Sequence, residues 1–124
     1  VGSWFNRRRP RRADARFARE TVPTLESFFD FLGDYAGLLY LELKCGGSER
    51  AALVEAVAGV VQRSKLLPRV VVKSFDLEAV SLVREKMPEA RAAVLFEPKL
   101  STVFARPRRL VELARRCGAD ELSV

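Results

Sequence analysis

The sequence predicts an α/β fold in which parallel strands are joined by crossover helices. Short apolar runs alternate with longer segments whose apolar residues recur every three or four positions. Gly, Pro or a helix-capping residue stands between them. The resulting order, α-β-α-β-α-β-α-β, requires a parallel sheet. Two architectures fit it: a doubly wound sheet, or part of a (β/α)8 barrel, which normally needs ~250 residues against 124 here.

Each predicted helix has a capping or terminating residue at one end. The helices are placed at about 25–34, 49–64, 77–87 and from Pro107 to the stop at Gly118. The expected N-caps of the first three are Thr24, Ser48 and Asp76. The predicted strands are Leu38–Lys44, Arg69–Phe75, Ala92–Glu97 and Glu121–Val124.

Residues 1–23 are predicted to form a loop, because Gly, Pro and a run of arginines interrupt any periodic pattern. Residues 1–20 hold seven arginines against two acidic residues, a net charge of +5, while the remainder carries 15 Lys and Arg against 14 Asp and Glu, or +1. The basic character therefore belongs to one segment. A nearly neutral remainder argues against a nucleic-acid surface that extends over the whole domain.

Several classes of function are excluded by composition. The chain has no histidine, so no Ser-His or Cys-His catalytic pair lies within it. Cys45 and Cys117 are too few for a zinc site and are interpreted as small thiols in a reducing, cytoplasmic compartment. No apolar run approaches the ~20 residues of a membrane span. Residues 1–124 are expected to be one domain, and the start at Val1 suggests a piece of a longer chain.

The strand Leu38–Lys44 ends in two charges. Tyr40, Glu42 and Lys44 share one face of it, and alternate leucines share the other. In a barrel the charged face points inward and its last residues reach the C-terminal rim, where active sites lie. There Glu42 suits a hard cation and Lys44 an anionic oxygen such as phosphate. A Glu–Lys pair on a solvated sheet rim is the other interpretation, and spacing alone leaves both open.

Three stretches, in this order, resemble the glycerophosphodiester phosphodiesterase family. The first is GSWF followed by RFARETVPTLESFFDFL, the second LYLELK, and the third VVVKSFD; all lie within residues 2–97, in the family's order. The resemblance implies a TIM-barrel hydrolase, active in lipid and glycerol metabolism, that cuts glycerophosphodiesters into glycerol 3-phosphate and an alcohol with Mg²⁺ or Ca²⁺. It implies a metal-ligand role for Glu42 and a catalytic phosphate contact for Lys44.

The segment lacks the rest of the family's site. The family's two catalytic histidines and its other two acidic ligands, carried by H-R-G, E-x-D and H-D motifs, belong to earlier strands. The chain is therefore similar to strands four to seven of the barrel, and is expected to be inactive alone. Exposed sheet edges predict that it associates with itself or aggregates.

Further residues are candidates for substrate binding. Lys73 is interpreted as a second phosphate contact or a rim residue, and Glu97 and Lys99 as lining the substrate pocket. Trp4 is expected either to contact an apolar part of the substrate or to pack its loop against the barrel.

The Arg7–Arg12 run departs from the family pattern, and the resemblance places it on the active-site face. It is expected to steer anionic phosphodiesters or to contact an acidic membrane surface; a solvated loop is the plainer interpretation. Nucleic acid is not the expected partner, because no aromatic stacking platform accompanies the run. The alternative function is a noncatalytic α/β module that binds acidic partners through Arg7–Arg19.

Overall fold

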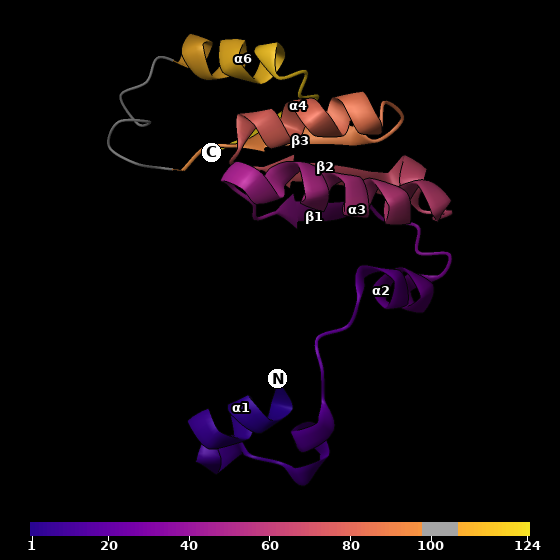
Figure 1. Cartoon of the computed structure of the whole chain (residues 1–124), viewed down its shortest axis with the longest axis vertical. Helices are drawn as coiled ribbons and strands as arrows, with labels where there is room; N and C mark the ends of the chain where they lie inside the picture. The colour runs from indigo at the N-terminus through magenta and orange to yellow at the C-terminus, as the bar shows by residue number, and fades with distance from the viewer. Residues whose placement is uncertain (98–106) are drawn as a thin grey trace. The chain divides into compact units, whose positions relative to one another are not determined.

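The computed structural model describes residues 1–97 and 107–124. They divide into two compact units, Val1–Phe31 and Leu32–Val124, drawn in Figure 1 in indigo to purple and in purple to yellow. The boundary falls inside helix α2 (Leu25–Leu32). The single-domain expectation for residues 1–124 stays a prediction.

The second unit contains the predicted parallel sheet, with strands in the order β1-β2-β3-β4. Each strand pairs with the next one along the chain, as crossover connections through helices require. The four strands lie within a residue or two of the predicted ranges: Leu39–Leu43, Val70–Ser74, Arg91–Leu95 and Glu121–Ser123. The α/β expectation is thereby confirmed.

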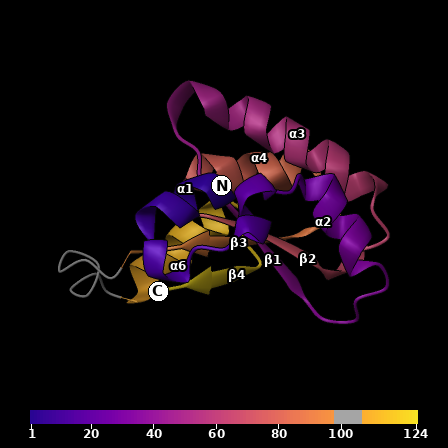
Figure 2. The same ribbon diagram turned by 90° about the horizontal axis from the view of Figure 1, so that it is seen from below.

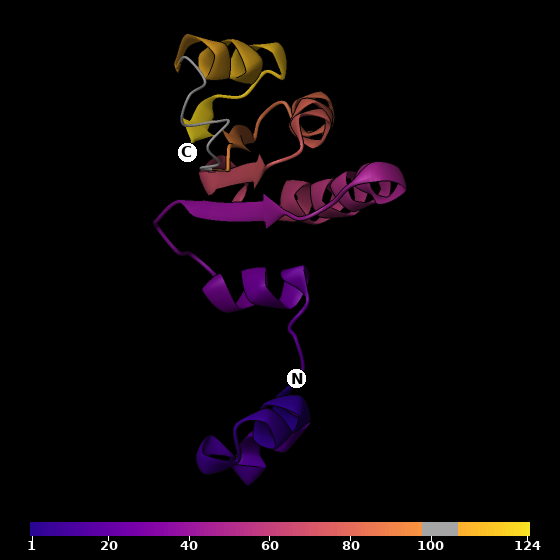
Figure 3. The same cartoon turned by 90° about the vertical axis from the view of Figure 1, so that its left-hand side faces the viewer.

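Three helices of this unit alternate with the strands: α3 (Arg50–Arg63), α4 (Leu77–Lys86) and α6 (Pro107–Arg116). Helix α4 contacts α3, β2 and β3, and Figures 2 and 3 show α3 and α4 side by side on one side of the sheet. The valine stripes of the two helices and the alternate strand residues under them form a dry core. Its fully buried members include Val54, Val61, Val70, Val72, Val80, Val83 and Val94.

Strand β1 alternates as predicted, because one of its faces is turned toward this core. Leu43 is buried and Leu39 and Leu41 are partly buried, whereas Tyr40 and Glu42 are exposed. The charged face of the strand is thus the face away from the helix-covered core.

Two of the three predicted helix caps are confirmed. The Asp76 carboxylate accepts the backbone N–H groups of Glu78 and Ala79 at 2.9 and 3.2 Å, and the Thr24 hydroxyl accepts that of Ser27 at 3.1 Å. The Ser48 prediction is wrong. Gly47, at φ +54, turns the chain into a short 3-10 turn, Gly47–Glu49, so α3 begins only at Arg50 without a side-chain cap.

The loop predicted for residues 1–23 is wrong as well. This stretch forms helix α1 (Gly2–Arg8) and two 3-10 turns, Pro10–Arg12 and Ala15–Arg19. The Phe5 and Phe17 rings meet edge to face at 5.9 Å. The side chain of Asn6 donates to the Asp14 carbonyl at 2.8 Å and accepts its N–H at 3.1 Å. These contacts join residues far apart in sequence, which local punctuation by Gly and Pro does not reveal.

Gly2 permits this fold. A Cβ at that position would lie 1.3 Å from the Phe17 carbonyl oxygen, so only glycine allows α1 to approach the second turn so closely. Among the described residues, no helix has the length and the apolar character that crossing a bilayer demands.

Candidate functional site

A shallow pocket of about 530 Å³ lies where β1 and β2 end. The two strands run in register, with Glu42 opposite Lys73 and Leu43 opposite Ser74, so their carboxyl ends reach the same level. The pocket is therefore built from the last residues of both strands and the first turns that follow them. Its lining includes Glu42, Lys44, Cys45, Glu49, Ser74, Phe75 and Asp76.

Glu42 and Lys44 are brought together in this pocket. Both side chains are exposed and leave the same face of β1. Within residues 1–97 and 107–124, neither forms a hydrogen bond or an ion pair. A carboxylate and an ammonium group that form no hydrogen bond or ion pair with the described residues are free to bind a ligand at the rim.

Lys73 stands beside them on the next strand but does not line the pocket. Its ammonium nitrogen lies 5.6 Å from the centre of the Tyr40 ring, within the range of a cation–π interaction. It is half-buried and lies opposite Glu42 in the strand register. Lys73 thus adds positive charge next to Glu42 on the same face of the sheet.

The face that carries these residues is curved. The Tyr40 hydroxyl of β1 and the Glu121 carboxylate of β4 are hydrogen bonded at 3.2 Å, and Arg91 of β3 pairs with the same carboxylate. Three strand spacings in a flat sheet amount to about 14 Å. Such a contact between the first and fourth strands needs a sheet that curls toward this face, as the wall of a barrel does.

The end of β2 is occupied by a structural cluster that sequence reasoning found only in part. The buried Ser74 hydroxyl donates to the Leu43 carbonyl at 2.9 Å and accepts the Asp76 N–H at 3.1 Å. Asp76 also accepts the Arg50 Nε–H at 2.7 Å, and Arg50 pairs with Glu78 as well. Arg50 was missed because its partners lie 26 and 28 residues further along the chain.

Asp76 stays ionised because of these partners. Burial raises the pKa of Asp76, but the hydrogen bonds from Arg50 and from the N–H groups of Ala79 and Glu78 outweigh it, so that this pKa lies below its ordinary value. The hydrogen bond to Asp76 raises the pKa of Arg50 in turn. The pair is thus fully engaged in holding the start of α4 against that of α3.

The other predicted site residues lie elsewhere. Glu97 is exposed two residues beyond the end of β3 and does not line the pocket, and Lys99 lies outside the described residues. Trp4 and Arg7 belong to the first unit, where the Trp4 side chain is 58% exposed. Both cysteines are free, as expected, with Cys117 buried and Cys45 partly so.

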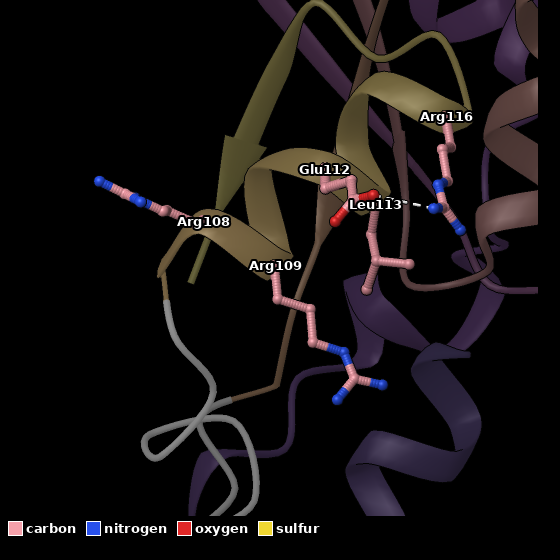
Figure 4. A pocket seen from close by; sticks show the side chains of 5 residues that line it. All are labelled: Arg108, Arg109, Glu112, Leu113 and Arg116. Atoms are coloured by element: carbon pink, nitrogen blue, oxygen red, sulfur yellow. Dashed lines mark hydrogen bonds and ion pairs between the residues drawn. The ribbon is translucent and has the colours of Figure 1, made fainter.

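A second pocket, of about 530 Å³, is lined among the described residues by side chains of helix α6. Figure 4 shows Arg109, Leu113 and Arg116 pointing to one side of the helix, with Arg116 joined to Glu112 and Arg108 pointing away. Its described lining includes no strand end, and the Glu112 carboxylate there is already paired with Arg116. The pocket at the ends of β1 and β2 is therefore the better candidate for chemistry.

The described residues do not form a complete metal centre. No group of three or more Cys, Asp and Glu side chains suited to a metal ion is found among them. Mg²⁺ and Ca²⁺ take six or more oxygen ligands, and part of these come from protein carboxylates. Since Asp76 is committed to Arg50 and to the helix cap, Glu42 fits one ligand position of such a centre rather than the whole of it.

No protein-family model matches the chain. A glycerophosphodiester phosphodiesterase of Bacillus subtilis (strain 168) is 31% identical over 105 residues, which cover 80% of this chain and 35% of that protein. One from Caldanaerobacter subterraneus subsp. tengcongensis is 26% identical over 82 residues, 66% of this chain and 34% of that protein. The chain spans about a third of the length of these curated relatives.

Solved structures agree in fold. A presumed glycerophosphoryl diester phosphodiesterase from Silicibacter pomeroyi DSS-3 superimposes with a TM-score of 0.66 at 28% identity, over 82% of this chain and 37% of that one. A presumed glycerophosphodiester phosphodiesterase from Galdieria sulphuraria gives 0.63 at 24% identity, over 82% and 41%. The chain is therefore an α/β segment with four parallel strands, and it forms part of a TIM-barrel fold. More particularly, the chain belongs to the glycerophosphodiester phosphodiesterase family.

Proposed function

We propose that this chain supplies one wall of the active site of a phosphodiesterase that hydrolyses glycerophosphodiesters to glycerol 3-phosphate and an alcohol. One observation carries the proposal: at the carboxyl end of a parallel strand, in a pocket of a family member, Glu42 and Lys44 lie together without an ion pair to any described residue. In barrel enzymes this end of the strands carries the catalytic groups.

In this proposal Lys44 binds the negatively charged phosphodiester directly, and Glu42 holds the cation. The Lys44 ammonium group would bind a non-bridging oxygen of the phosphodiester and stabilise the negative charge that grows there in the transition state. Glu42 would hold one coordination position of a Mg²⁺ or Ca²⁺ ion. Such a cation, when bound, polarises a phosphoryl oxygen. Lys73 would add positive charge beside them.

The proton transfers must come from outside these residues. In the proposed reaction, water adds to phosphorus, the bond from phosphorus to the oxygen of the alcohol breaks, and that oxygen gains a proton. The chain has no histidine, and the Asp76 carboxylate in the pocket is already engaged by Arg50 and by the cap of α4. The polypeptide that carries this segment is therefore expected to contain the H-R-G, E-x-D and H-D motifs before it.

The test is an assay of the complete gene product that carries this segment. We expect glycerol 3-phosphate to be released from glycerophosphocholine with added Mg²⁺ or Ca²⁺, and Glu42→Gln to lower kcat/KM on the order of 100-fold or more. Glu85→Gln is the matched control, because it removes the same charge from the exposed side of α4, away from the pocket. A gene product without the three motifs, or equal activities of the two variants, would contradict the proposal.

A further inference from the structure

The outward side of helix α1 combines an aromatic ring with positive charge. Gly2 is buried against Phe17, and the Phe5 ring packs on that of Phe17, so this side of α1 faces the second turn. Trp4, Arg7 and Arg8 are spaced to lie on another side of the helix, three and four positions apart. The Trp4 side chain is 58% exposed and both arginines are exposed.

The positive charge of this unit is almost entirely unneutralised. Within the described residues, Arg16 is the only arginine of the segment 1–20 with an ion pair, to Asp14 at 2.7 Å. Arg8, Arg9, Arg11 and Arg12 line an open hollow of about 650 Å³. The proline at the start of the 3-10 turn and the Asn6–Asp14 hydrogen bonds fix the backbone that carries them. The arginines are therefore displayed by a folded scaffold.

We propose that this basic–aromatic surface, comprising Trp4, Arg7, Arg8, Arg9, Arg11 and Arg12, docks on an anionic lipid surface. The inference does not depend on the hydrolase activity. Basic side chains next to an exposed tryptophan match the headgroup region of a bilayer, which offers negative charge outside and an apolar boundary beneath. Single-stranded nucleic acid is a poorer fit, because successive bases need several exposed aromatic rings, and Trp4 is the one exposed ring on this side of α1.

The experiment is vesicle flotation of the 124-residue chain. Vesicles of phosphatidylcholine alone are compared with vesicles that hold 30% phosphatidylserine, at low and at high salt. Flotation separates bound protein, which rises, from any aggregated protein, which sinks. We expect binding to the anionic vesicles only, lost at high salt because the attraction is screened. Since Trp4 is the chain's only tryptophan, brominated lipids should quench its fluorescence when the surface docks.

Charge-matched variants identify the surface responsible. Replacing Arg7, Arg8 and Arg9 by Ser is expected to weaken binding on the order of 100-fold, since each basic residue near an anionic bilayer contributes about fivefold. The control replaces Arg108, Arg109 and Arg115 of α6 by Ser, which removes the same charge from other exposed positions, and is expected to bind almost as the wild type does. Far-ultraviolet circular dichroism checks that both variants remain folded.

Three results would overturn the proposal. The first is equal binding to neutral and anionic vesicles. The second is equal weakening in the two triple variants, which would indicate attraction by net charge alone. The third is binding to heparin or polyglutamate as tight as to the vesicles, with Trp4 unquenched by brominated lipid, which would assign the surface to a soluble acidic partner. The quenching measurement uses the wild-type chain, so it tests whether Trp4 enters the lipid even if a variant misfolds.

Discussion

The end of β1 and the end of β2 both carry an acid and a base beside the same pocket, but they differ in their partners. At β2, Asp76 caps α4, pairs with Arg50 and is linked through Ser74 to β1. At β1, Glu42 and Lys44 have no such partners among the described residues. Each site has a carboxylate and a basic side chain, although Asp76 follows its strand and Arg50 begins α3. What separates a structural charge from a candidate for chemistry here is whether the fold already neutralises it.

The largest expected effect is the loss of activity when Lys44 is replaced. If that loss were absent, the ends of β1 and β2 would not differ as proposed. Replacing Lys44 by Met should lower kcat/KM of the complete gene product on the order of 100- to 1000-fold, as loss of one transition-state charge contact does. The midpoint of thermal unfolding should hardly change, because Lys44 forms no hydrogen bond or ion pair with the described residues. Lys44→Arg should recover part of the activity. If the activity and the thermal midpoint fell together, Lys44 would act by stabilising the fold, as Asp76 and Arg50 do.

Next comes the stability of the β2 end. Replacing Asp76 by Ala removes the cap of α4 and should lower the free energy of unfolding by about 1–2 kcal/mol. Glu42→Gln, which breaks no contact, should stay within about 0.5 kcal/mol of the wild type. Urea unfolding followed by circular dichroism measures both. If both substitutions lowered the free energy of unfolding equally, the hydrogen bonds of Asp76 would not make the end of β2 more important for stability than the end of β1.

The Asp76 cluster also predicts a dependence on pH. The folded-state pKa of Asp76 lies below that of the unfolded chain, about 3.9, because of the hydrogen bonds from Arg50 and the helix N–H groups. The unfolded chain therefore binds the proton first as the pH falls. The resulting stability is complete above about pH 5 and is lost as the pH drops through the folded-state pKa. The difference in unfolding free energy between wild type and Asp76→Asn should shrink over that range, and a constant difference would contradict the assignment.

The smallest effect concerns the curl of the sheet. Replacing Tyr40 by Phe removes the hydrogen bond to Glu121 and keeps the ring beneath Lys73. The expected loss is about 0.5–1 kcal/mol. Replacing the exposed Tyr35 by Phe serves as the matched control. If the two substitutions cost the same, the contact between β1 and β4 contributes nothing measurable.

Much of the fold was accessible from the sequence because its signals are local. Alternation on β1 and the Asp76 cap each depend on neighbours within a few residues, and these predictions were confirmed. The first turns of the chain were mispredicted as a loop because the Asn6–Asp14 and Phe5–Phe17 contacts that hold them skip 8 and 12 residues.

The candidate site also had a part that local sequence signals reveal and a part that depends on contacts between residues far apart in sequence. Glu42 and Lys44 were identified because they stand two positions apart on one strand. That Arg50 neutralises Asp76, and that nothing described neutralises Glu42, follows from three-dimensional neighbours. The Tyr40 contact to Glu121 spans 81 residues and left no trace in the sequence pattern.

That long-range contact has a consequence for how the chain folds. Within the described residues, each strand pairs with its neighbours in sequence, so each pairing becomes available as soon as the later of its two strands leaves the ribosome. The Tyr40 contact must wait for β4, because loop-closure entropy delays contacts of high sequence separation. Synthesis in order therefore allows the four strands to pair one unit at a time, and the bond from Tyr40 to Glu121 can form only after β4 has been made.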